Sequence, residues 1–140
     1  MADRIFAEEK VIDLFRDLTL ASQTTRNSDF REQPFSELKL AFLWAVSIGV
    51  HEKHRTVLEG KKEGLFRWAN LDPDELSFLQ AIALAETEDI NVLTDIDMIQ
   101  MISEEYANFG IRALKEYFSD GSGNPLWKLV YLADTKGIVQ

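Results

Sequence analysis

The two histidines of this chain, His51 and His54, are three residues apart, a spacing that can place two imidazoles on one helical face as metal ligands. A site needs a third ligand, and only Glu52 or a distant carboxylate could supply it. Lys53 and Arg55 stand beside the histidines and disfavour a bound cation. We therefore predict two exposed loop histidines, with no metal and no cofactor. A small metal-dependent hydrolase is kept as the third functional hypothesis.

The same stretch concentrates positive charge in a chain whose formal net charge is −9. Residues 51–67 hold three glutamates and five basic residues, which are Lys53, Arg55, Lys61, Lys62 and Arg67. Five minus three gives a local charge of +2, which leaves −11 for the rest of the chain. Such a dipolar surface can steer docking onto a partner with the opposite pattern. The five basic residues are our candidates for contact with a partner or with phosphates, and a solvated loop is the simpler interpretation.

Acidic residues cluster at 72–75, 86–89 and 95–97, which raises the hypothesis of a Mg²⁺ or Ca²⁺ site. Two of the clusters stand at predicted helix starts, where carboxylates are favoured by the helix dipole and by capping. None follows the spacing of a calcium-binding loop. Helix capping is therefore the better explanation.

A further polar group, Glu104, Glu105, Tyr106 and Asn108, stands in the middle of a helical pattern. Two carboxylates could act in acid–base catalysis if one of them were buried. Adjacent residues of a helix point about 100° apart, so the two glutamates do not converge. We predict a structural or interface role for this group. The chain has neither a glycine-rich phosphate loop nor a serine nucleophile elbow, which disfavours an enzyme without excluding one.

Hydrophobic spacing is helical nearly throughout and predicts an all-α fold, a compact single-domain bundle of about five helices over residues 1–140. The predicted helices cover residues 3–21 (with Glu8 facing water), 36–49, 73–85, 94–118 and 126–133. Asp72, Pro73 and Glu75 form a strong helix start. Gly49 is predicted to end the second helix, and Gly110 to mark the close approach of a neighbouring helix. Only residues 51–69 leave room for a short β element.

The length of 140 residues, the 46% of hydrophobic residues and the lack of cysteine fit one globular domain without disulfides. The N-terminal residues lack the basic start and apolar run of a signal peptide. The longest apolar stretch, residues 38–50, is too short to span a bilayer. We therefore predict a cytoplasmic protein with no membrane contact.

The segment ISEEYANFGIRALKEYF (102–118), preceded by LSFLQAIALAETEDINVLTD (76–95), resembles a small family of accessory proteins of Dnd-type DNA phosphorothioation systems. The family signature is matched at Glu104, Glu105, Tyr106, Ala107, Asn108, Gly110 and Leu114, and Phe109 stands where a small residue is typical. Residues 42–49 and Arg55 resemble an earlier block of the family. These bacterial systems replace a non-bridging phosphate oxygen with sulfur and restrict unmodified DNA. The resemblance implies no catalytic residue.

The leading hypothesis is a non-catalytic accessory subunit that docks onto other proteins of a DNA-modification and restriction system, and contacts DNA only weakly or through the complex. The alternative is a nucleic-acid-associated regulator in which the basic residues of 51–67 contact phosphates. Alone this segment is too small to hold DNA at physiological salt, because few counterions would be released. A homodimer is also compatible with the aromatic residues Phe30, Phe35 and Trp68 beside polar loops.

Overall fold

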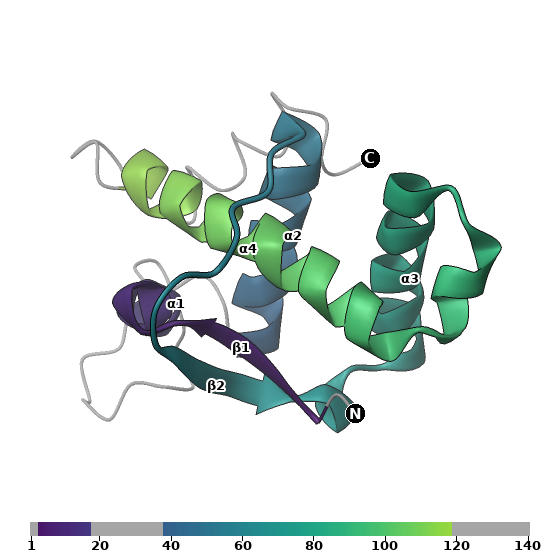
Figure 1. The fold of residues 1–140 in the computed structure, drawn as a ribbon. Helices are drawn as coiled ribbons and strands as arrows, with labels where there is room; N and C mark the ends of the chain where they lie inside the picture. The colour runs from purple at the N-terminus through teal and green to yellow at the C-terminus, as the bar shows by residue number, and fades with distance from the viewer. Residues whose placement is uncertain (1–2, 18–37, 119–140) are drawn as a thin grey trace.

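The computed structural model describes residues 3–17 and 38–118, which form a mostly helical unit with a small two-stranded sheet (Figure 1). The prediction of an all-α fold with a short β element around 51–69 is thus correct for most of these residues and wrong for strand β1 (Arg4–Glu8). The elements, in chain order, are β1 (Arg4–Glu8), the 3-10 helix η1 (Glu9–Val11), α1 (Ile12–Asp17), α2 (Leu38–Glu52), β2 (Lys62–Arg67), the 3-10 helix η3 (Trp68–Asn70), α3 (Pro73–Thr87), the 3-10 helix η4 (Ile90–Thr94) and α4 (Ile96–Phe118). The predicted helix 126–133, Phe30 and Phe35 lie outside the described residues.

The sheet pairs β1 with β2 in antiparallel register, with Arg4 opposite Arg67 and Glu8 opposite Lys62. The predicted β element around 51–69 is therefore confirmed. The predicted helix 3–21 is wrong in its first part, because Ile5 and Ala7 are buried at a spacing of two residues, the period of a strand. Its helical part begins only at α1. The first segment has too few residues to distinguish a helical period from a strand period without knowledge of the partner strand.

Helices α2 and α4 cross at two glycines, where their backbones touch. A Cβ at Gly110 would overlap the carbonyl oxygen of Ala45, and a Cβ at Gly49 would lie 2.5 Å from the carbonyl oxygen of Tyr106. The close approach predicted at Gly110 is confirmed. Gly49 does not end α2 as predicted, because it lies inside the crossing. The helix continues to Glu52, and Lys53 leaves it with a left-handed φ of 57°.

Helix α3 begins with the predicted capping box, in which Asp72 and Glu75 each bind the other's backbone N–H. The long helix α4 begins in a similar way, since the Asp95 side chain accepts a hydrogen bond from the Met98 N–H (3.1 Å). Leu79 of α3 is fully buried in the common core. These helices position the polar residues of α4 opposite the loop 53–61 and strand β1. In the described part of the chain, no helix is both long and apolar enough to cross a bilayer.

Candidate functional site

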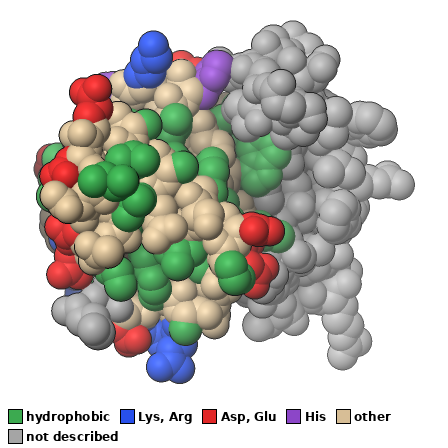
Figure 2. Space-filling model, turned by 90° about the vertical axis from the view of Figure 1, so that its right-hand side faces the viewer, with side chains coloured by type: hydrophobic (Ala, Val, Ile, Leu, Met, Phe, Trp, Pro, Cys, Tyr) green, Lys and Arg blue, Asp and Glu red, His purple; other side chains and the backbone are tan. Residues whose placement is uncertain are grey.

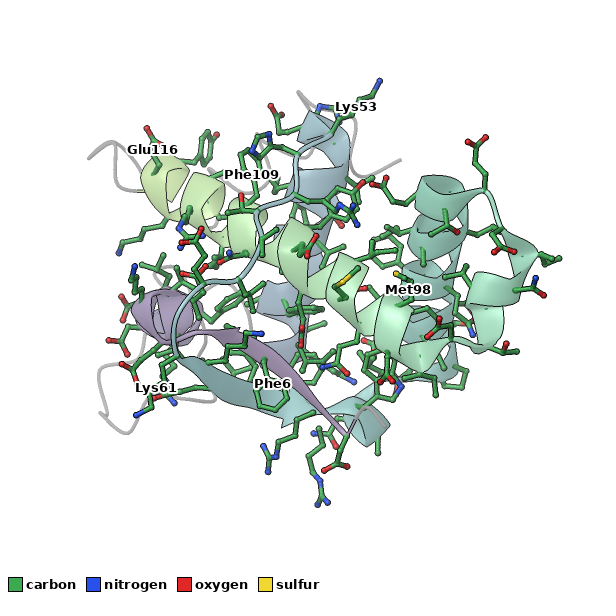
Figure 3. All side chains as sticks on the ribbon, in the orientation of Figure 1. Phe6, Lys53, Lys61, Met98, Phe109 and Glu116 are labelled. Atoms are coloured by element: carbon green, nitrogen blue, oxygen red, sulfur yellow. The ribbon has the colours of Figure 1, made fainter. Side chains whose placement is uncertain are left out.

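The four polar residues in the middle of α4 point in different directions, and each binds a different segment of the chain. As expected from the helix geometry, Glu104 and Glu105 do not converge, and Tyr106 and Asn108 serve different neighbours. Figure 3 shows the side chains along α4, including the labelled Phe109 and Met98. The contacts of these residues decide whether the group is available to a substrate or partner.

Asn108 joins α4 to strand β1 and to the loop 53–61. It is 3% exposed, and its Nδ2 donates to Glu8 Oε2 (2.8 Å) and to the Thr56 carbonyl (3.1 Å). Glu8 also accepts from the backbone N–H of Glu59 (3.0 Å) and from Arg112 (2.9 Å). Asn108 therefore holds three segments together, and its polar atoms are already occupied within the chain.

Glu8 is a buried carboxylate that this network keeps ionised. Its burial would raise its pKa, but hydrogen bonds from Asn108, the Glu59 backbone and Arg112 outweigh that effect and hold the pKa below 4.5. The prediction that Glu8 faces water is wrong, because the residue is 3% exposed at the end of β1. The burial of this carboxylate is tolerated because the fold supplies the hydrogen-bond donors that stabilise its charge.

Glu104 and Gln100 bind the outer edge of β1. The Phe6 N–H donates to Glu104 Oε2 (2.7 Å), and Gln100 Nε2 donates to the Arg4 carbonyl (2.8 Å) and to the same Glu104 oxygen (2.8 Å). Burial raises the pKa of Glu104, although these hydrogen bonds and Lys62 oppose the shift. The two side chains thus take the place of a third strand along β1.

An open groove of about 430 Å³ lies beside this contact, between β1 and the first turns of α4. It is lined by Asp3, Arg4, Phe6, Lys62, Asp97, Gln100, Met101 and Glu104. Charges of both signs line it, and Glu104, whose pKa is raised by burial, already binds β1. Two of its lining side chains, Glu104 and Gln100, are thus already bound to the chain itself.

Glu105 and Tyr106 bind the loop that follows α2, through Arg55. The Arg55 guanidinium lies 3.3 Å from Glu86 and 3.6 Å from Glu105, and its centre lies 5.8 Å from the centroid of the Tyr106 ring. The Tyr106 hydroxyl donates to Glu86 Oε2 (2.8 Å). Burial, together with this bond to Glu86, raises the pKa of Tyr106. Arg55 is therefore engaged by α3 and α4.

The other basic residues of 51–67 are exposed and spread over the molecule. Lys53 stands at the end of α2, and Lys61 precedes β2 at the opposite end of the loop (Figure 3). Lys61 lies 3.6 Å from Glu9, with its side chain 78% exposed. Lys62 begins β2, and Arg67 ends it opposite Arg4. The structure therefore divides the segment between two ends of the sheet and the end of α2.

The two histidines lie near Lys53 but do not face a common metal position. His51 is exposed in the last turn of α2, and the His54 ring packs on Phe109 with 4.6 Å between centroids. Within residues 3–17 and 38–118, no three side chains of His, Asp or Glu are grouped as metal ligands. Phe109, the residue that differs from the typical family signature, therefore packs against the loop 53–61.

Sequence reasoning missed the roles of Glu8 and Gln100, and it considered Arg112 only as a partner of Glu104 or Glu105, whereas Arg112 binds Asn108 and Glu8. Glu8 and Arg112 are 104 residues apart in the chain, so neither spacing nor composition connects them. The one local signal is the i, i+4 spacing of Asn108 and Arg112, whose side chains bind each other at 2.7 Å.

Glu104, Glu105, Tyr106 and Asn108 of the signature segment thus each bind another part of the same chain. No curated protein and no solved structure is significantly similar to this chain. A family model does match it over residues 12–136, which include the whole signature segment of α4. The chain therefore belongs to the DNA sulphur modification system-associated protein 4 family.

Proposed function

We propose that this chain is a non-catalytic accessory subunit of a bacterial DNA phosphorothioation-linked modification and restriction system, and that it acts by docking onto other proteins of that system. The observation that carries the proposal is the internal use of the signature residues. Glu104, Glu105, Tyr106 and Asn108 each bind another segment of the chain. A residue so occupied supports a rigid scaffold, and the contacts that perform the function come from the exposed surface.

Family membership supports the choice of partners, because other proteins of the same sulphur modification system are the natural candidates. Lys53, Lys61, Lys62 and Arg67 are exposed and available as contacts with a protein or with phosphates. Arg55 contributes by fixing the loop between them, through Glu86 and Glu105. Such a scaffold would recruit or orient partner proteins and would not catalyse a reaction itself.

The test is reconstitution with defined proteins. Each protein of the same sulphur modification system is purified and mixed with the full-length chain, and complex formation is measured by size-exclusion chromatography with light scattering. We expect a stable complex with at least one of them. If none of them binds, or if the isolated chain itself hydrolyses or modifies DNA, the proposal is wrong.

The alternative function, a nucleic-acid-associated regulator, is supported by the adjacent exposed lysines Lys61 and Lys62. It predicts micromolar DNA binding by the isolated chain that weakens steeply with salt. The double variant Lys61→Glu/Lys62→Glu would abolish that binding, whereas Lys10→Glu/Lys115→Glu, which changes the net charge equally outside the segment, would leave most of it. Salt-dependent binding with this pattern would favour the regulator over the docking subunit.

A further inference from the structure

The negative charge of this protein is concentrated in one part of the fold, the acidic lobe, which we define as residues 71–97. These residues contain eight Asp and Glu and no Lys, Arg or His. The remaining residues contain 16 acidic and 15 basic side chains, so they carry −1 of the total −9 and the lobe carries −8. The charge asymmetry of the chain thus lies mainly in this lobe, rather than in the basic segment 51–67.

The acidic lobe comprises α3, η4 and the first residues of α4, which lie side by side at the right of Figure 1. Gln80 of α3 donates to the Leu93 carbonyl of η4 (3.4 Å), and Leu79 and Ala83 bury the inner face of α3. The whole lobe is therefore one ordered surface with a fixed orientation relative to α4.

Part of the negative charge of the lobe is compensated within the fold. Glu75 lies 3.0 Å from Lys39, and Glu86 lies 3.3 Å from Arg55. Asp74, Glu88 and Asp97 are exposed, and none of the ion pairs found among residues 3–17 and 38–118 includes them. These three carboxylates are thus available for ion pairs with Lys or Arg side chains of another molecule.

Apolar side chains are exposed on the same lobe. Ile90, directly after Glu88 and Asp89, is 71% exposed, and Phe78 and Ile96 are 38% and 39% exposed. Figure 2 looks onto this side of the molecule and shows hydrophobic side chains among Asp and Glu, with Lys and Arg near its upper and lower margins. Apolar anchors beside charges of one sign are typical of a protein–protein interface.

We propose that the acidic lobe is the docking surface for a positively charged surface of a partner protein, with Ile90 as an apolar anchor. The occupant follows from the charge. A surface with an excess of negative charge repels nucleic acid, and it also repels the same lobe of a second copy. Proteins that handle DNA carry Lys and Arg surfaces that bind phosphates, and these complement the lobe. This inference rests on the proposed docking function and names its surface and the chemistry of its partner.

The test measures affinity by isothermal titration calorimetry between the full-length chain and each purified protein of the same sulphur modification system. The lobe variant is Asp74→Asn/Glu88→Gln/Asp97→Asn. The control variant, Asp13→Asn/Glu59→Gln/Glu116→Gln, raises the net charge equally through exposed residues elsewhere. Circular dichroism of each variant verifies that it is folded.

For the protein that binds, we expect the lobe variant to weaken binding by about tenfold or more and the control by less than about twofold, because only the lobe faces the partner. Ile90→Ala, which removes no capping group, should also weaken binding measurably, and higher salt should weaken the wild-type complex. These results together would support the inference.

Two other outcomes are distinguishable. If a protein binds but the lobe and control variants behave alike, or if Lys61→Glu/Lys62→Glu alone abolishes the complex, docking uses another surface and this inference is wrong, while the proposed function stands. If none of the proteins of the system binds, the proposed function fails, and this inference fails with it.

Discussion

The close crossing of α2 and α4 leads us to predict a stability change for Gly110→Ala that is opposite to the one expected from helix propensity. Replacing Gly110 by alanine in an ordinary helix interior stabilises the helix by about 1 kcal/mol. Here the new Cβ would overlap the Ala45 carbonyl oxygen and lie 2.5 Å from the Ala45 carbonyl carbon and 2.9 Å from its Cα. All three atoms belong to the backbone, so no side chain can rotate to make room. The Gly110→Ala variant should therefore be less stable than the wild type.

The size of the effect follows from the overlap. Carbon atoms in contact are normally about 3.5–4.0 Å apart, so the two helices would have to separate by roughly 1 Å. Overpacking of this kind costs up to about 3 kcal/mol. Subtracting the propensity gain of about 1 kcal/mol leaves a net loss of about 2 kcal/mol, or roughly a 30-fold rise in the unfolding equilibrium constant.

Urea denaturation of the full-length chain, followed by circular dichroism at 222 nm or by tryptophan fluorescence, measures this change at about 25 °C. Ala113→Gly, one turn along α4, is the control for propensity and should lose about 1 kcal/mol. The double variant Gly49→Ala/Gly110→Ala should lose less than the sum of the single variants, because both open the same crossing. A Gly110→Ala protein as stable as the wild type, or more stable, would refute the reasoning.

Four further predictions concern the polar contacts of α4. Asn108→Ala should cost about 2 kcal/mol in unfolding free energy, measured by urea denaturation, because it removes a donor from a buried carboxylate. Glu8→Gln should be less stable at neutral pH. Because the folded pKa of Glu8 is lowered, its stabilisation is present above 4.5 and is lost as the pH falls toward the folded pKa, so the difference from wild type should shrink there. The pKa of Glu104 is raised in the folded state, so wild-type stability should decline as the pH rises from 4.5 through this higher, folded pKa. Thermal melts of the Glu104→Gln variant should lack this decline. Arg55→Ala should lose about 1 kcal/mol, with raised amide exchange in the loop 53–61, and an unchanged loop would contradict the role of Arg55.

The helical part of the fold was predictable because its signals are local. The capping box at Asp72 and Glu75 and the long apolar stripe through Ile99, Ile102 and Tyr106 identify α3 and α4 from neighbouring residues alone. The first strand was not predictable in this way. Ile5 and the apolar residues after it fit a helical stripe, and only the hydrogen bonds of β2 decide for a strand.

The sequence places the polar residues of α4 on one helix, but it does not give the contacts that they make. Helix geometry correctly separates Glu104 from Glu105 and Tyr106 from Asn108. It cannot name their partners, because Phe6 is 98 residues from Glu104 in the chain and Glu8 is 100 residues from Asn108. Such long-range contacts depend on the packing of the whole fold, for which one sequence carries no local signal.

The placement of β1 has a consequence for synthesis. This strand is synthesised long before α4, yet its outer edge is bound by Glu104 and Gln100 of α4 and its last residue by Arg112. Its contacts with α4 cannot form until roughly a hundred further residues have been translated, which takes on the order of 5–20 s in bacteria. The outer edge of β1 therefore stays unbound for that time, and its capture by Glu104 and Gln100 comes after the pairing of β1 with β2.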